Sequence, residues 1–273
     1  MFSTYFFVSL QQLKLKTMKT RATIFCALAA TMMLTSACKS HYQVASVERT
    51  RILVDSRYDK QPDAKITEFM KPYKQQVDSV MGPVVGQSAR YMTKNRPESE
   101  LSNLLSDILV WAGAKYGEKP DFGLYNMGGI RADLPKGPVT YGDVLDVAPF
   151  ENKIAFGTLK GSEVLELFEQ IASTGGEGVS KSVRMVITPD HKLVSVTING
   201  EAIKPHHNYR LTTIDYLLGG SDKMEALKKC RDINAPKEKA NNTRFIIMDY
   251  FREMQAQGKV VDAEVEGRIV IEH

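Results

Sequence analysis

Apolar residues recur at helical spacing in several separate segments of the chain. Between positions 98 and 115, one apolar stripe consists of Leu101, Leu104, Leu105, Ile108, Leu109 and Trp111. This spacing predicts an amphipathic helix, and Pro97 suits its first turn. The same reasoning predicts further helices over residues 66–80, 142–147, 161–173, 223–230 and 242–257, the last of them ending at Gly258.

Shorter runs with the composition of β-strands lie between the predicted helices. We predict strands over residues 121–125, 153–159, 182–188, 192–198, 201–203, 209–214 and 268–271. Asn199-Gly200 is a strong hairpin turn between two of them. Because helices and strands are mixed along the chain while hairpins intervene, we expect an α+β fold. A mixed β-sheet packed with helices fits this order better than a doubly wound parallel sheet.

The first 37 residues have the pattern of a secretory signal peptide. A short basic start at Met18–Arg21 precedes a mostly apolar run, Ala22–Leu34, and small residues then lead to Cys38. The apolar run is too short to span a bilayer comfortably. A cysteine directly after Ser-Ala resembles a bacterial lipobox, in which Cys38 becomes the lipid-modified N-terminus. Ordinary secretion with cleavage nearby is the alternative.

This pattern predicts the domain organisation and the location of the protein. We expect a signal peptide over 1–37 whose true start is Met18, a lipidated Cys38 with a tether over 38–60, and one folded domain over 61–273. The protein is then an exported lipoprotein, anchored to a bacterial membrane only through this lipid and facing the periplasm or the cell surface.

Removal of the predicted signal peptide changes the charge of the chain. The full chain has a formal charge of +4, but its first 37 residues hold four basic and no acidic side chains. The remainder has 32 basic and 32 acidic residues, which argues against nucleic acid as a partner. Cys230 is the only cysteine left beside Cys26 and Cys38, so we expect it to be a structural thiol.

The segment Asn126-Met127-Gly128-Gly129-Ile130-Arg131 places two glycines between an amide and a guanidinium. Glycine lets a backbone bend tightly and approach a ligand closely. The amide supplies a donor and an acceptor, and the guanidinium supplies a planar cation. These residue types predict a site for a polar, anionic small molecule. An exposed Arg131 is normally a solvated charge, but the glycines and nearby Asp133 favour a fixed orientation.

Several blocks of the sequence together resemble the C-terminal domain of the 5′-nucleotidases. These blocks are residues 126–131, Thr140–Asp143, Val147–Asn152, Glu98–Asp107, Gly161–Leu165 and Tyr209–Asp222. The family includes UDP-sugar hydrolases and 2′,3′-cyclic phosphodiesterases, and the resemblance spans roughly residues 62–271. It implies a 5′-nucleotidase C-terminal-domain-like fold and a nucleotide or nucleoside ligand.

The resemblance also implies roles for individual residues. Phe150 and Tyr216 fall on a pair of rings that hold the base, and Asp222 falls on the carboxylate that binds ribose. Asn126 falls on a contact to the base, beside Gly128 and Gly129 of the turn. From the residues alone, each assignment has an alternative. Phe150 follows an apolar run and can be a core residue, and Asp222 can be the N-cap of a helix that begins near Lys223.

The phosphate side of the predicted site departs from the family. Arg131 falls on a residue that contacts the phosphate or the ribose. The position of the family's second arginine aligns with Asn95 here. If the alignment is shifted by one residue, Arg96 takes that position. The turn before Asp222 also lacks the last glycine of the family pattern, since Lys223 stands there.

The catalytic half of such an enzyme is missing from the sequence. In the family, two metal ions are bound by a separate N-terminal domain with Asp-x-His, Gly-Asn-His-Glu/Asp and Gly-His-x-His motifs, and none of these motifs occurs here. We expect no catalytic residue, metal or cofactor in this chain. Divalent metals such as Mn²⁺ or Zn²⁺ are expected in a partner metallophosphoesterase chain.

Three functions remain open from the sequence. The first is the nucleotide or nucleoside recognition half of a 5′-nucleotidase-type phosphohydrolase of nucleotide catabolism, inactive without a separate metallophosphoesterase chain. The second is a stand-alone nucleoside- or nucleotide-binding lipoprotein without turnover. The third is a structural lipoprotein whose pocket has decayed, against which the presence of Phe150, Tyr216 and Asp222 argues.

Overall fold

The computed structural model describes residues 16–21, 23–26, 44–53, 55–57, 59–60 and 62–272. The chain divides into two units, Met1–Pro62 and Asp63–His273. In the first unit, residues 16–21 and 23–26 are helical. No helix of the described residues is long and apolar enough to cross a membrane. Cys38 and much of the predicted signal peptide lie outside the described residues, so both stay predictions.

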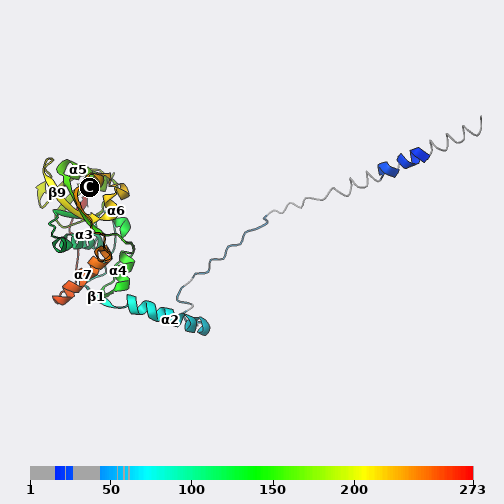
Figure 1. The fold of residues 1–273 in the computed structure, drawn as a ribbon, viewed down its shortest axis with the longest axis horizontal. Coiled ribbons are helices and arrows are strands. Elements are labelled where there is room, and N and C mark those ends of the chain that lie inside the picture. Colours follow the sequence, from blue (N-terminus) through cyan, green and yellow to red (C-terminus); the bar gives the residue numbers. More distant parts are fainter. Residues whose placement is uncertain are drawn as a thin grey trace, which may run out of the picture. The chain divides into compact units, whose positions relative to one another are not determined.

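The helices of the second unit follow the apolar stripes of the sequence (Figure 1). They are α2 (Ala64–Met81), α3 (Glu100–Ala112), α4 (Tyr141–Val147), α5 (Gly161–Ser173), α6 (Asp215–Leu218) and α7 (Thr243–Ala256). Local capping sets their starts: the Ser99 hydroxyl accepts from the backbone of Ser102 at α3, and Thr140 does the same from Asp143 at α4. Five short 3-10 helices join them, namely Gly113–Tyr116, Met127–Gly129, Ser221–Lys223, Glu225–Lys229 and Lys239–Asn241.

The strands of the second unit form three sheets. Their bounds are β1 (Val84–Ser88), β2 (Phe122–Tyr125), β3 (Gly137–Thr140), β4 (Ile154–Lys160), β5 (Gly178–Val179), β6 (Val183–Ile187), β7 (Leu193–Ile198), β8 (Glu201–Ala202), β9 (Asn208–Ile214), β10 (Arg231–Asn234) and β11 (Ile269–Ile271). The central sheet has the order β10-β4-β9-β2-β5, in which β2 and β9 are parallel and β4 and β9 antiparallel. The predicted α+β fold with a mixed sheet is therefore confirmed.

Two details of the predicted elements were wrong. Residues 223–230 do not form one helix, because Asp222 and Lys223 both have positive φ and the chain continues as a separate 3-10 turn. The short strands β1, β3, β5 and β10 were not predicted. β5 has only two residues and β10 is mostly exposed, so neither shows the alternation that marks a half-buried strand.

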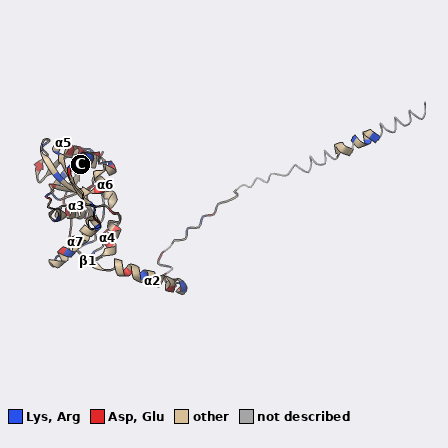
Figure 2. Ribbon diagram, in the orientation of Figure 1, with Lys and Arg blue, Asp and Glu red and all other residues tan. Residues whose placement is uncertain are grey.

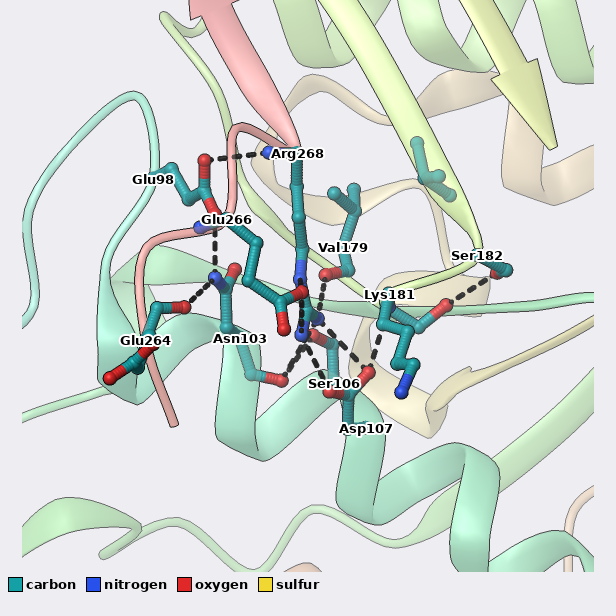
Figure 3. A network of polar contacts seen from close by, with 12 residues as sticks. Glu98, Asn103, Ser106, Asp107, Val179, Lys181, Ser182, Glu264, Glu266 and Arg268 are labelled. Atoms are coloured by element: carbon teal, nitrogen blue, oxygen red, sulfur yellow. Dashed lines mark hydrogen bonds and ion pairs between the residues drawn. The ribbon is translucent and has the colours of Figure 1, made fainter. Parts of the chain in front are cut away.

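A buried polar network ties the C-terminal strand to α3 (Figure 3). The Glu98 carboxylate accepts hydrogen bonds from the Asn103 side chain at 2.6 Å and from the Arg268 backbone at 2.7 Å. The Arg268 guanidinium, 2% exposed, donates to both carboxylate oxygens of Asp107 and to the Val179 carbonyl. We call Glu98, Asn103, Asp107 and Arg268 the C-terminal network. The network holds α3 against the segment that leads into the C-terminal strand β11. Because β2 packs on α3, it is held in place as well.

Candidate functional site

Six of the eight predicted ligand-binding residues meet at one cavity at the end of β2. The cavity has a volume of about 200 Å³ and is lined by Asn126, Gly128, Gly129, Phe150, Asn152, Tyr216 and Asp222. We call this cavity the ring pocket and take Asn126, Phe150, Tyr216 and Asp222 as its principal residues. They come from three separate segments, at residues 126, 150 and 216–222, so only the fold brings them together.

The floor of the ring pocket is the turn that follows β2. This strand is buried along its whole length, and the chain stays buried at Asn126 and Met127 before it reaches the surface at Gly128. The Gly129 amide then donates to the Asn126 carbonyl at 3.0 Å, which closes the turn. A Cβ atom on Gly129 would lie 2.5 Å from Oδ1 of Asn126, so a larger residue here would force the Asn126 side chain to move.

Buried Glu177 holds the same turn from behind. One of its oxygens accepts from the Met127 amide at 2.5 Å, and the other accepts from the Arg96 guanidinium at 2.7 Å. Arg96 also donates to the Gly176 carbonyl. Arg96 therefore supports the turn and does not line the ring pocket. Its predicted contact with phosphate stays a prediction.

The Asp222 carboxylate is fixed over the floor of the pocket. Nδ2 of Asn126 donates to one of its oxygens at 2.5 Å, and the Tyr216 hydroxyl donates to the other at 3.0 Å. The backbone of Asp222 has φ 55°, a left-handed conformation that non-glycine residues seldom adopt. Its side chain makes no N-cap hydrogen bond, so the alternative interpretation of Asp222 as a helix cap is wrong. Strain of this kind is typical of functional sites.

Both aromatic rings of the pocket face solvent. Phe150 is 47% exposed and Tyr216 is 45% exposed, although each lines the cavity. The alternative interpretation of Phe150 as a core residue is therefore wrong. Tyr216 stands on α6, directly after β9, and Phe150 follows α4. An apolar ring left half exposed beside a cavity is the arrangement that a planar ligand can cover by stacking.

Polar groups of the pocket are only partly satisfied within the chain. Oδ1 of Asn126 is buried and has no hydrogen-bond partner among the described residues. A buried acceptor without a partner is unfavourable. The hydrogen bond to Asp222 raises the pKa of the Tyr216 hydroxyl above its ordinary value, so this hydroxyl stays protonated and donating at neutral pH.

Arg131 lies at the edge of the ring pocket. Its guanidinium carbon is 6.0 Å from the centre of the Phe150 ring, and its backbone amide donates to the Val147 carbonyl. Among the described residues, no carboxylate pairs with this guanidinium. Asp133 does not orient it as expected, because that carboxylate accepts instead from the Tyr91 hydroxyl and the Lys94 amide. Arg131 is thus an exposed cation beside a half-exposed ring.

Asn152 was not among the predicted site residues, although it lines the cavity. It stands two positions after Phe150, within the block Val147–Asn152 that carries the resemblance. Among the described residues, no cluster of three or more His, Cys, Asp or Glu side chains has the arrangement of a metal site. The pocket therefore supplies two rings, a carboxylate, two amides and a nearby cation.

Comparison with known proteins defines the class of this domain. The sequence profile described as 5′-nucleotidase, C-terminal domain matches residues 79–229, more than half of the chain. The chain therefore belongs to the 5′-nucleotidase C-terminal domain family. The ring pocket lies inside the matched region.

Individual relatives agree with this assignment. A cell wall protein of Listeria monocytogenes is 27% identical over 234 residues, which are 77% of this chain and 29% of that protein. Protein UshA of Yersinia enterocolitica is 31% identical over 160 residues, 58% of this chain and 28% of its own length. The structure of a 5′-nucleotidase precursor from Thermus thermophilus superposes with a TM-score of 0.64 at 28% identity, covering 75% of this chain and 42% of that one. The chain thus spans less than a third of these two curated relatives.

Proposed function

We propose that this chain is the nucleotide or nucleoside recognition half of a 5′-nucleotidase-type phosphohydrolase. The observation that carries the proposal is the ring pocket, where half-exposed Phe150 and Tyr216 line one cavity with Asn126 and Asp222. The base stacks on the two rings, and its polar edge meets the amide of Asn126. The ribose hydroxyls donate to Asp222, since a carboxylate suits a vicinal diol.

The phosphate group of a nucleotide lies toward Arg131 in this proposal. Arg131 is an exposed cation at the edge of the pocket, beside the Phe150 ring. Its planar guanidinium can donate two hydrogen bonds to one phosphate. This residue therefore binds and orients the charged end of the substrate.

Catalysis in this proposal depends on a second chain. The ring pocket, at about 200 Å³, is smaller than the roughly 300–1,000 Å³ of ordinary ligand sites. It thus fits one part of a nucleotide rather than the whole. A separate metallophosphoesterase chain supplies divalent metal ions that activate water and stabilise the phosphoryl charge. Residues of this chain bind and orient the substrate.

Release of phosphate tests the division of labour. Purified chain with AMP and Mn²⁺ or Zn²⁺ releases no phosphate above background, and addition of a metallophosphoesterase chain encoded in the same genome restores turnover. Metal-dependent hydrolysis by the lone chain would reject the proposal. Binding of AMP without turnover under every combination would favour the stand-alone binding lipoprotein instead.

We further propose that the chain is exported and lipid-anchored through Cys38. The support is the basic start, apolar run and Ser-Ala-Cys sequence at the beginning of the chain, and one relative is a cell wall protein. Expression in bacteria grown with an alkyne fatty acid labels the wild-type chain and not the Cys38→Ala variant. Equal labelling of both, or labelling of neither, would remove the anchor from the account.

A further inference from the structure

Helix α2 carries an apolar stripe that nothing in the described chain covers. Ile66, Phe69, Met70, Tyr73, Val77 and Val80 recur at helical spacing along one face, and their exposed fractions lie between 49% and 64%. No residue of this 18-residue helix is buried. A surface helix normally packs such a stripe against other apolar groups, and a large exposed stripe marks an interaction site.

The C-terminal end of α2 is joined to the part of the domain that carries Phe150. Met81 is half-buried against Gly142 of α4, and the Tyr141 amide donates to the Pro83 carbonyl at 3.0 Å. α4 then leads to Phe150. Figure 1 shows that most of α2 extends away from the other elements of the unit. The stripe is therefore presented to the outside by a helix that is fixed at one end.

Charges on α2 favour a protein over a membrane as the occupant of the stripe. Residues of both signs occur along the helix (Figure 2). Lys71 pairs with Glu68 and Lys74 pairs with Asp78, so Lys65 is the only unpaired cation within the described helix. Helices that lie on anionic membranes carry an excess of Lys and Arg on the polar face. On α2 this excess is a single charge, Lys65.

The position of α2 in the fold indicates which protein covers it. The chain matches a family described as a C-terminal domain and spans 42% of the related Thermus thermophilus structure, so more than half of that relative lies outside the matched part. α2 is the first element of the folded unit, and the family profile begins only at residue 79, near its end. The stripe thus stands at the N-terminal border of the region that matches the C-terminal domain profile.

We propose that the apolar stripe of α2 is the docking surface for the metallophosphoesterase chain. This inference rests on the proposed function, because it names the surface by which the second chain is recruited. The partner carries a complementary apolar groove that buries the stripe. α2 and α4 then hold that chain at the same side of the domain as Phe150, where the ring pocket is open.

Binding measurements on surface variants test this inference. Purified full chain is immobilised, and each chain of the same genome that has the metallophosphoesterase motifs but no domain of this family is passed over it. We expect one of them to bind, and Phe69→Glu and Val77→Glu each to weaken that binding at least tenfold. Gln75→Glu is the matched control, because it adds the same charge on the polar face of the same helix, and it changes binding less than twofold.

Separate measurements distinguish this inference from the proposed function. Calorimetry with AMP on the chain alone reports the ring pocket, and all three α2 variants keep the wild-type affinity. Equal partner binding by Phe69→Glu, or no binding by any of the candidate chains, would overturn the docking surface. Two other results would also overturn it. One is a dimer of the wild-type chain in analytical ultracentrifugation that the Phe69→Glu substitution dissociates. The other is binding of the unlipidated chain to lipid vesicles that the same substitution abolishes.

Discussion

The C-terminal network and the ring pocket are both polar clusters assembled from distant parts of the sequence, but they differ in how completely their groups are paired. In the network, the Arg268 guanidinium is buried against Asp107, and the Glu98 carboxylate accepts several hydrogen bonds. In the pocket, two rings stand half exposed, and one oxygen of Asn126 has no partner among the described residues. The closed cluster stabilises the domain, whereas the open one is where we propose that the ligand binds.

This contrast separates stability from binding in a way that mutations can test. Removal of a group from the C-terminal network should change the free energy of unfolding and leave ligand contacts in place. Removal of a ring from the pocket should change the affinity for a nucleotide and leave unfolding nearly unchanged. Glu177 stands between the two cases, since it is buried but supports the floor of the pocket.

The largest effect is expected for Arg268→Ala. This variant leaves the Asp107 carboxylate without its guanidinium partner and empties a buried position. Breaking a buried pair by removing one partner destabilises a protein by about 3–5 kcal/mol. Urea denaturation measures the change, with Arg131→Ala as the control, which should stay within about 0.5 kcal/mol because its side chain is exposed. A loss below about 1 kcal/mol for Arg268→Ala would contradict the structural role of the network.

Removal of the pocket rings is expected to act on binding instead. Phe150→Ala and Tyr216→Ala should each weaken binding of adenosine and AMP by about 1–3 kcal/mol, the usual contribution of one base–aromatic stack. Because both rings are half exposed, the free energy of unfolding should change by less than about 0.5 kcal/mol. Isothermal titration calorimetry measures the affinities, and Tyr73→Ala on α2 is an exposed aromatic control away from the pocket. Unchanged affinity in both pocket variants removes the stacking assignment.

A smaller effect is expected for the Tyr216 hydroxyl. Tyr216→Phe keeps the ring but frees the Asp222 oxygen that the hydroxyl occupies. The ribose diol then meets less competition, so the preference for adenosine over 2′,3′-dideoxyadenosine should rise roughly two- to tenfold, or about 0.5–1.5 kcal/mol. Competition binding with the two nucleosides gives this ratio. An unchanged or lower ratio would argue against a contact between ribose and Asp222.

The smallest effect concerns pH. Since the hydrogen bond to Asp222 raises the pKa of Tyr216, the bond is complete below pH 10 and is lost only as the pH rises through the raised pKa. The titration of Tyr216 is followed by absorbance at 295 nm, as the difference between the wild type and Tyr216→Phe. We expect the midpoint of this difference to lie above pH 10. Asp222→Asn should move this titration downward. A Tyr216 titration at or below pH 10 in the wild type would show that the bond does not form in solution.

Much of the fold could be predicted because its helices carry regular apolar stripes. The predicted helix at residues 161–173 has the bounds of α5, and the strands β7 and β8 around Asn199-Gly200 pair as expected. The turn near Asp222 could not be predicted, because Lys223 takes a positive φ that its residue type does not suggest. Strands β1 and β3 depend on pairing with each other across more than 40 residues, which periodicity within a short window does not reveal.

The residues of the candidate site could be predicted from short blocks of sequence, but the hydrogen bonds between them could not. The sequence pointed to Asn126, Phe150, Tyr216 and Asp222 one by one. The hydrogen bond from Asn126 to Asp222 spans 96 residues and depends on the packing of β2 beside β9. The bond from Tyr216 to Asp222 spans only 6 residues, but it depends on the turn at Asp222. The roles of Arg96 and Asp133 could not be foreseen for the same reason, since their partners lie in other segments.

A crystal structure of the purified chain grown with AMP would show the occupant of the ring pocket. We expect a base stacked on the rings of Phe150 and Tyr216, ribose hydroxyls on the Asp222 carboxylate, and the phosphate toward Arg131. A nucleotide bound at another surface, or a ring pocket that stays without one while AMP is in large excess, would contradict this expectation.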